Sequence, residues 1–129
     1  MDTYVRFRSA RPALDLVALE RFYVDALGCS KLAAFTGHDD FDGLVVGAPD
    51  AGWQVEFLVE RGRVALPPPD PEQLLVFYVR DRAALDARCL TMDAAGCERV
   101  APNNPYWQVH GVTYRDPEGY AVVIAVAPG

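Results

Sequence analysis

Two stretches, Val24-Asp25-Ala26-Leu27-Gly28-Cys29 and Met92-Asp93-Ala94-Ala95-Gly96-Cys97, decide how this sequence is expected to fold. They share an Asp-Ala pair followed by Gly-Cys, and they are offset by 68 positions (92 − 24) in a chain of 129 residues. A pattern repeated at a fixed spacing indicates a duplicated structural unit. Each stretch has a glycine as its fifth residue, Gly28 and Gly96, which is typical of the end of a helix. The sequence therefore predicts one small module that is present twice, with a helix in each copy.

The first half of the chain predicts a strand, a helix and three further strands. The helix is predicted by apolar residues spaced by three and four, with Asp15 as its N-cap and Gly28 just past its end. The strands are predicted by alternating or apolar runs bounded by Gly, Asp and Pro, at residues 4–9, 31–35, 43–48 and 53–60. The proline-rich residues 61–73 have no periodicity and predict a connector.

The second half repeats this order of elements. Its helix is predicted over 82–95, between an N-cap at Asp81 and a terminating Gly96. Its strands are predicted at residues 74–79, near 97–101, at 109–115 and at 120–126. We therefore predict a single domain, 1–129, with module one at 1–60, the connector at 61–73 and module two at 74–129.

Composition and charge narrow the classes of partner. The net charge of −6 argues against nucleic acid and against anionic membranes, because both require a basic face. No apolar run approaches the roughly 20 residues of a membrane span, and no signal peptide is visible, so a cytoplasmic location is expected. The three cysteines have no Cys-x-x-Cys spacing and are expected to be free thiols. A neutral or cationic small molecule is the expected partner.

Several motifs resemble those of a known superfamily. They are Phe22-Tyr23-Val24-Asp25-Ala26-Leu27-Gly28 at the end of the first helix and Asp116-Pro117-Glu118-Gly119 before the last strand, within two βαβββ modules. The whole chain is similar to the vicinal oxygen chelate superfamily, which includes glyoxalases, bleomycin-resistance proteins and extradiol dioxygenases. The segments 35–38, 74–79 and 104–107 further resemble its YycE-like subgroup. The resemblance implies an α+β fold in which the two modules form a cupped mixed sheet with helices on its outer face.

The resemblance also implies where a metal would bind. In metal-dependent members of the superfamily, the first and last strands of each module supply four ligands, typically His or Gln from the former and Glu from the latter. The corresponding residues here are Arg8, Glu56, Leu74 and Val123. Of these, only Glu56 can coordinate a metal, since Arg, Leu and Val offer no suitable donor. No metal and no other cofactor is therefore expected, and Arg8 is expected to pair with Glu56 or with an anionic ligand.

Two histidines leave alternatives open. His38, in an acidic turn, is interpreted either as a solvated residue or as a hydrogen-bonding or acid/base group at the rim of the cup. His110 is interpreted as a partly exposed loop residue in preference to a catalytic one. The acids of residues 38–42 do not form a calcium loop, because the twelfth position of such a loop would be Pro49 and not Glu. An unusual metal site made of His38, His110 and Glu56 is a further alternative, but nothing in the spacing of these residues indicates that they converge.

Apolar and aromatic residues predict a binding pocket. Strand alternation places Leu74, Tyr78 and Val123 on the cup side, together with the polar Gln54 and Glu56. Tyr106 and Trp107 follow Asn104-Pro105 in a predicted loop and serve either as a lid or as loop anchors. The residues expected to bind the ligand are Arg8, His38, Gln54, Glu56, Leu74, Tyr78, Tyr106, Trp107 and Val123.

Three function classes follow from this pocket. The favoured one is metal-independent binding of a small aromatic or cationic molecule, by analogy with the antibiotic-sequestering members of the superfamily. The second is a lyase or isomerase with Glu56 as general base and Arg8 stabilising an oxyanion, with or without a metal. The third is a purely structural module, whose cup would be filled by the protein's own side chains. The resemblance also implies a homodimer.

Overall fold

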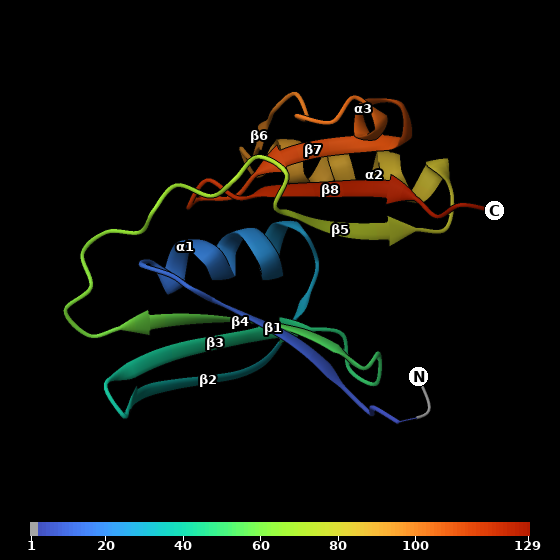
Figure 1. Ribbon diagram of the computed structural model, residues 1–129. Coiled ribbons are helices and arrows are strands. Elements are labelled where there is room, and N and C mark those ends of the chain that lie inside the picture. The colour runs from blue at the N-terminus through green and yellow to red at the C-terminus, as the bar shows by residue number, and fades with distance from the viewer. Residues whose placement is uncertain (1–2) are drawn as a thin grey trace. The chain divides into compact units, whose positions relative to one another are not determined.

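Each half of the chain folds into a four-stranded mixed sheet with a helix packed on one face (Figure 1). The computed structural model describes residues 3–129. It divides into two compact units, Met1–Pro67 and Pro68–Gly129, and the boundary falls inside the predicted connector. Two mixed sheets with helices confirm the predicted α+β class and the duplication of the βαβββ order. The single-domain organisation stays a prediction.

Unit one, which contains module one, has the sheet order β1-β4-β3-β2. The first strand runs parallel to the last, and the other pairs are antiparallel. The helix continues from α1 into a wider π-helical turn, η1. The elements are β1 (Phe7–Pro12), α1 (Leu16–Glu20), η1 (Arg21–Ala26), β2 (Ser30–His38), β3 (Phe41–Gly47) and β4 (Trp53–Glu60).

Unit two, which contains module two, has the equivalent order β5-β8-β7-β6, again with a parallel first and last strand. One element has no predicted counterpart, the short helix α3. The elements are β5 (Leu74–Val79), α2 (Arg82–Ala94), β6 (Glu98–Arg99), α3 (Tyr106–His110), β7 (Gly111–Arg115) and β8 (Ala121–Val126). No helix in the described part of the chain is long and apolar enough to cross a membrane.

The predicted helix boundaries are confirmed by hydrogen bonds. The Asp15 side chain accepts from the Ala18 amide at 3.1 Å, and Asp81 accepts from the Ala84 amide at 2.9 Å. Gly96 has φ +82°, and the Cys97 amide donates to the Met92 carbonyl at 3.0 Å, which completes a Schellman end.

The equivalent end in unit one is one residue wider. Gly28 has φ +90°, and the Cys29 amide donates to the Tyr23 carbonyl at 2.9 Å, six residues back instead of five. The π-helical turn supplies the extra residue. The repeated Gly-Cys pair therefore ends the helix in both modules, through the positive φ of the glycine and the hydrogen bond donated by the cysteine amide.

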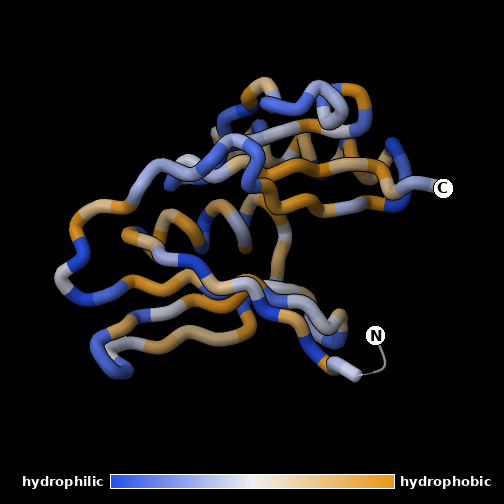
Figure 2. The backbone as a smooth tube through the Cα atoms, in the orientation of Figure 1, coloured by the Kyte–Doolittle hydropathy of each residue, from blue (hydrophilic) through white to orange (hydrophobic). Residues whose placement is uncertain are grey.

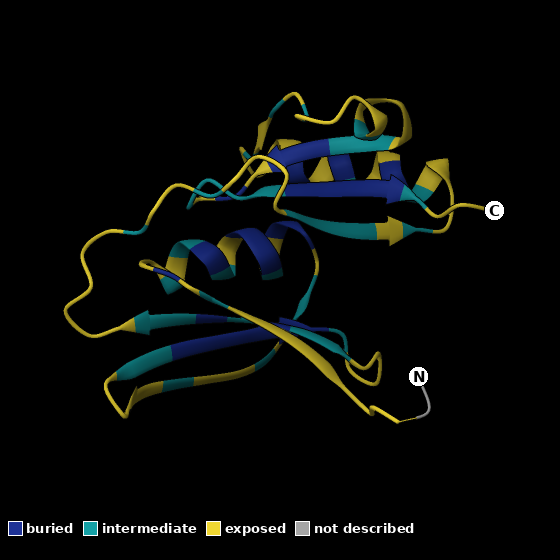
Figure 3. Ribbon diagram, in the orientation of Figure 1, coloured by how far each residue is buried: buried dark blue, intermediate teal, exposed yellow. Residues whose placement is uncertain are grey.

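The core of each unit lies between its sheet and its helix. In unit one Tyr23 packs against Phe57 with ring centroids 4.8 Å apart, and both are fully buried. In unit two Leu85, Cys89 and Met92 of α2 are buried over the sheet. Most residues of strands β5 and β8 are hydrophobic, whereas the tip of the β2–β3 hairpin is hydrophilic (Figure 2). The central strand β8 is buried and the edge strand β1 is exposed (Figure 3).

Several strand boundaries differ from the prediction. The first strand is Phe7–Pro12 and not 4–9, because an edge strand tolerates a proline whose missing N–H would face away from its single neighbour. Val5 therefore precedes the strand and is 91% exposed, instead of half-buried. Strand β2 extends to His38, beyond the predicted 31–35, because Asp39 and Asp40 both adopt positive φ and close a tight hairpin after it.

The region before β7 also differs. Residues 106–110 form the helix α3 and not a loop leading directly into a strand, so the predicted strand 109–115 begins only at Gly111. The Asn104 side chain accepts from the Tyr106 amide at 3.0 Å at the start of this helix, as an Asx turn does. Strand β6 is only Glu98–Arg99, shorter than the predicted 97–101.

Sheet register identifies equivalent residues of the two modules. Gly43 pairs with Leu58 as Gly111 pairs with Ala125, so the offset is 68 in the third strand (111 − 43) and 67 in the fourth (125 − 58). Six residues, 48–53, lie between the last paired positions of unit one, Gly47 and Gln54, whereas five residues, 116–120, lie between Arg115 and Ala121 of unit two. This one extra residue explains why the repeat distance falls from 68 to 67.

Candidate functional site

Three polar side chains meet on the face of the unit-one sheet that points away from its helix. The Arg8 Nε donates to Gln54 Oε1 at 2.9 Å, and its Nη1 lies 3.5 Å from Glu56 Oε2. The parallel pairing of β1 with β4 produces this cluster, because Arg8 lies opposite Gln54 and two residues before the partner of Glu56. Glu56 is only 13% exposed, whereas Arg8 is 42% exposed. The expected pairing of Arg8 with Glu56 is therefore present.

The equivalent positions of unit two are apolar. Register places Leu74 where unit one has Arg8, Ala121 where it has Gln54, and Val123 where it has Glu56. Val123 is fully buried in the central strand β8 and presents no open surface to a ligand. Unit two instead has a polar side chain, Thr113, on the neighbouring strand β7. Thr113 pairs with Val123, whereas the equivalent pair of unit one is Val45 with Glu56.

These residues do not fit the metal site of the superfamily. A divalent cation needs several oxygen or nitrogen ligands, and a single carboxylate already paired with a guanidinium is a poor one. Among residues 3–129 no group of three or more His, Cys, Asp or Glu side chains is arranged to hold a metal ion. The donor set of this chain therefore disagrees with the ligand set that the fold implies.

An aromatic cluster stands at one end of the unit-two sheet. The rings of Tyr78 and Trp107 are 6.5 Å apart, those of Trp107 and Tyr106 are 4.9 Å apart, and those of Tyr106 and His110 are 4.2 Å apart. With Arg82 and the end of β8 they line a cavity of about 330 Å³, which we call the aromatic pocket. Of the predicted residues, Tyr78, Tyr106 and Trp107 thus come together.

Sequence reasoning missed two members of this pocket. The sequence predicts a loop position for His110, but His110 ends α3 and its ring packs against that of Tyr106 at a tilt of 35°. The spacing of Tyr106 and His110 by four residues, which places them on one side of a helical turn, was the available signal. Arg82, at the start of α2, also lines the pocket, and its Nε lies 3.1 Å from the Asp86 carboxylate.

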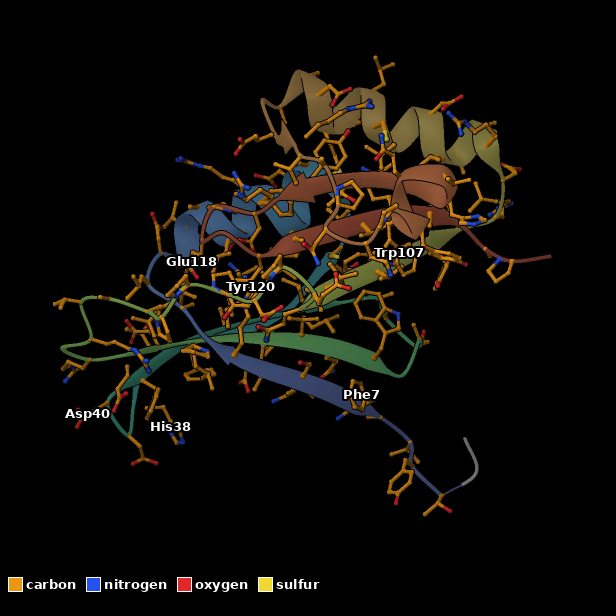
Figure 4. The ribbon with its side chains drawn as sticks, turned by 45° about the horizontal axis from the view of Figure 1, so that its top comes forward. Phe7, His38, Asp40, Trp107, Glu118 and Tyr120 are labelled. Carbon is orange, nitrogen blue, oxygen red and sulfur yellow. The ribbon has the colours of Figure 1, made fainter. Side chains whose placement is uncertain are left out.

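His38 lies apart from the polar cluster of unit one. It ends β2 at the hairpin tip and pairs with Phe41, which in turn faces Glu60 at the far end of β4. Figure 4 shows His38 and Asp40 at this tip, with Phe7 toward the other end of the unit. Its side chain is exposed, and Nε2 lies 3.6 Å from the Asp39 carboxylate. The solvated-turn interpretation fits this position better than a role beside Glu56.

A second cavity lies in unit one, and Gln54 belongs both to its wall and to the polar cluster. It has a volume of about 650 Å³ and is open between the segment before β1 and the β3–β4 connection. Its walls include Tyr4, Arg6, Leu32 and Asp50, so it mixes charge of both signs with apolar surface. Its aromatic wall residues are Tyr4 and Trp53.

A separate polar network fixes α2 to the sheet of unit two. Asp93 accepts from Arg99 Nη2 at 2.7 Å and from the buried Tyr114 hydroxyl at 2.8 Å. The hydrogen bonds from Arg99 and then Tyr114 hold the pKa of Asp93 below its ordinary value. Burial, together with its hydrogen bonds to Cys89 and Asp93, raises the pKa of Tyr114. Asp93, Arg99 and Tyr114 line neither of these two cavities, so the network has a structural role.

Two family models match this chain. The model of the YycE-like N-terminal domain matches residues 7–58, and the model of the YycE-like C-terminal domain matches residues 72–125. Together they span most of the chain, and their boundaries follow the two modules. The chain belongs to the YycE-like family. Through that family it belongs to the vicinal oxygen chelate superfamily, as its motifs indicated.

Individual relatives support this assignment. The uncharacterized protein YycE of Bacillus subtilis (strain 168) is 36% identical over 124 residues, which are 96% of this chain and 89% of that protein. The crystal structure of a YycE protein of unknown function from Bacillus subtilis superposes with a TM-score of 0.88 at 35% identity, covering 97% of this chain and 91% of that one.

More distant structures share the fold. The glyoxalase I of Leishmania major has a TM-score of 0.73 at 16% identity, covering 92% of this chain and 84% of that one. The antibiotic-binding protein TnmS3 of Streptomyces sp. CB03234 has a TM-score of 0.67 at 22% identity, covering 98% of this chain and 97% of that one. At these identities the likeness shows the fold alone. The fold therefore serves both enzymes and binding proteins.

Proposed function

We propose that this protein binds a small planar aromatic molecule in its aromatic pocket without the help of a metal. The observation that carries the proposal is the cluster of four rings around a cavity of about 330 Å³. Tyr78 and Tyr106 are about half exposed, so their ring faces are available to a ligand. Stacking on such rings contributes about 0.5–1.5 kcal/mol beyond the burial of apolar area.

Charge favours a neutral or cationic ligand. The chain carries a net charge of −6, and Arg82, the one arginine that lines the pocket, already pairs with Asp86. A planar cation can also interact with the faces of the aromatic rings. The antibiotic-binding neighbour TnmS3 supports a sequestering role, in which an antibiotic is bound and not altered.

A thermal-shift screen in EDTA tests this proposal. The probes are a planar cationic acridine, a neutral anthraquinone and the divalent ions Mn²⁺, Ni²⁺ and Zn²⁺. We expect a rise in Tm with an aromatic probe, because a ligand that binds only the folded state stabilises it by mass action. Trp107→Ala should weaken binding about tenfold or more, while Leu90→Ala, an exposed apolar truncation on α2, should not.

The same screen can contradict the proposal. Equal affinity of the wild type and the Trp107→Ala variant for every aromatic probe would remove the aromatic pocket from consideration. A rise in Tm with a metal ion that disappears in Glu56→Gln would instead indicate a metalloprotein.

A second function is favoured by the environment of Glu56. This carboxylate is nearly buried and lies 3.5 Å from a guanidinium that could stabilise an oxyanion, as a lyase or isomerase requires. If Glu56 is the general base, Glu56→Gln should abolish turnover of a carbonyl substrate and leave binding in the aromatic pocket unchanged. The homodimer implied by the superfamily stays a prediction that sedimentation of the purified protein tests.

A further inference from the structure

Thr113 of β7 carries a hydroxyl group for which the fold has no use. The residue is 4% exposed, and its Oγ1 has no hydrogen-bond partner within residues 3–129. It points away from α2, because its neighbour Tyr114 points toward that helix and donates to Asp93. The equivalent residue of unit one is Val45, which fills the same sheet position without a polar atom. A valine at position 113 would avoid the cost of burying an unsatisfied hydroxyl.

Thr113 lines a cavity of about 490 Å³, which we call the Thr113 pocket. Its walls combine the apolar residues Pro69, Pro71, Leu74 and Pro102 with polar surface from Asn103 and Arg115. It shares no residue with the aromatic pocket. Leu74 begins β5 and Tyr78 stands four residues later, so the two pockets are separated by about 13 Å along that strand. In Figure 4 Tyr120, beside the wall residues Gly119 and Ala121, lies toward the opposite end of this unit from Trp107.

We infer that the Thr113 pocket binds the carbonyl group of a small, uncharged molecule with an apolar body, such as an aryl ketone or an amide. A hydroxyl without a partner can donate its proton to a carbonyl oxygen and is then satisfied. Among the described residues of the wall Arg115 alone is charged, and its Nη1 lies 3.4 Å from the Glu98 carboxylate. A neutral group therefore enters without leaving a charge unpaired, whereas a carboxylate would compete with Glu98 for Arg115. This site goes beyond the proposed function, and either can fail without the other.

The test compares three probes of nearly the same shape. Acetophenone carries the carbonyl, α-methylstyrene replaces its oxygen with a methylene group, and benzoate replaces the ketone with an anion. Binding is followed by amide chemical-shift changes of the ¹⁵N-labelled protein at Asn103, Thr113 and Gly119. We expect acetophenone to perturb these amides and to bind about tenfold more tightly than α-methylstyrene or benzoate.

Two variants at one position assign the effect to the hydroxyl. Thr113→Val keeps the shape and should weaken acetophenone about tenfold while leaving α-methylstyrene unchanged. Thr113→Ser keeps the hydroxyl and should retain the preference for acetophenone. Trp107→Ala should leave these shifts unaltered, which separates this site from the aromatic pocket. Equal affinity of the wild type for acetophenone and α-methylstyrene, or unchanged acetophenone affinity in Thr113→Val, would overturn the inference.

The unliganded protein gives an independent readout. Because Thr113→Val removes an unsatisfied hydroxyl, the midpoint of urea unfolding should rise. A lowered midpoint would mean that the hydroxyl already serves a partner within the protein, and it would overturn the inference as well.

Discussion

Modules one and two have the same sheet order and the same helix ends, yet they place polar groups differently on equivalent strands. Module one has a carboxylate on its fourth strand, Glu56, opposite an apolar Val45. Module two has a hydroxyl on its third strand, Thr113, opposite an apolar Val123. The same strand order therefore accommodates a polar side chain on either the third or the fourth strand. The difference teaches that burial and charge pairing, not backbone geometry, decide which chemistry each sheet face can hold.

The largest expected effect comes from exchanging the residues at the fourth-strand position. Val123→Glu should lower the free energy of unfolding by more than about 3 kcal/mol, because Val123 is fully buried and its partners in the sheet register, Val76 and Thr113, are uncharged. Glu56→Val should cost about 1 kcal/mol or less, because Arg8 is partly exposed and water can solvate it once its partner is gone. Urea denaturation of both variants measures the contrast, and similar losses would break the comparison.

A smaller contrast is expected at the glycines that occupy equivalent positions in β3 and β7. A Cβ at Gly111 would meet the Ile124 carbonyl oxygen of the neighbouring strand, which cannot move without distorting the sheet. A Cβ at Gly43 would meet the Phe35 ring, which can rotate aside. We expect Gly111→Ala to cost about 2–3 kcal/mol and Gly43→Ala about 1 kcal/mol. The midpoint of denaturant unfolding checks the order of the two values, and the reverse order would contradict it.

The smallest expected effect concerns Tyr114, whose equivalent in module one is Val46. Tyr114→Phe removes the hydrogen bond to Asp93 and should cost about 1 kcal/mol at neutral pH. The pKa of Tyr114 is raised in the folded state from 10.0, so the unfolded chain loses this proton first as pH rises. The wild type should therefore lose stability above about pH 10, and the Phe variant should lose less of it. Parallel pH profiles for the two proteins would contradict this.

Much of the fold could be predicted because its signals are local. The N-caps Asp15 and Asp81 and the glycines after each helix act within one turn, and each lies where the sequence indicated. The exact edges of the strands could not be predicted in the same way. Strand β1 extends through a proline because it pairs with only one neighbour, and this depends on its place in the sheet.

The candidate site was predictable in part for the same reason. Strand alternation alone placed Gln54 and Glu56 on one face and Tyr78 on the cup side of module two. How far a residue is buried depends on its contacts with residues distant in the sequence, so strand alternation could not show that Val123 is fully buried. Nor could it find Thr113, because a threonine inside a strand is ordinary until its hydroxyl is seen to lack a partner.

The exposed strand β1 gives Arg8 a second role that its ion pair does not reveal. A strand paired on one side presents free backbone groups on the other, and such an edge can recruit strands from neighbouring molecules. Arg8, Arg11 and Pro12 are the kinds of residue that discourage this self-association. Replacing Arg8 would therefore promote aggregation as well as remove the partner of Glu56. Strand β1 thus contributes Arg8 to the polar cluster and also protects the protein against aggregation. Glu56 lies on β4, away from this exposed edge, so its replacement tests the chemistry of the cluster without lowering solubility.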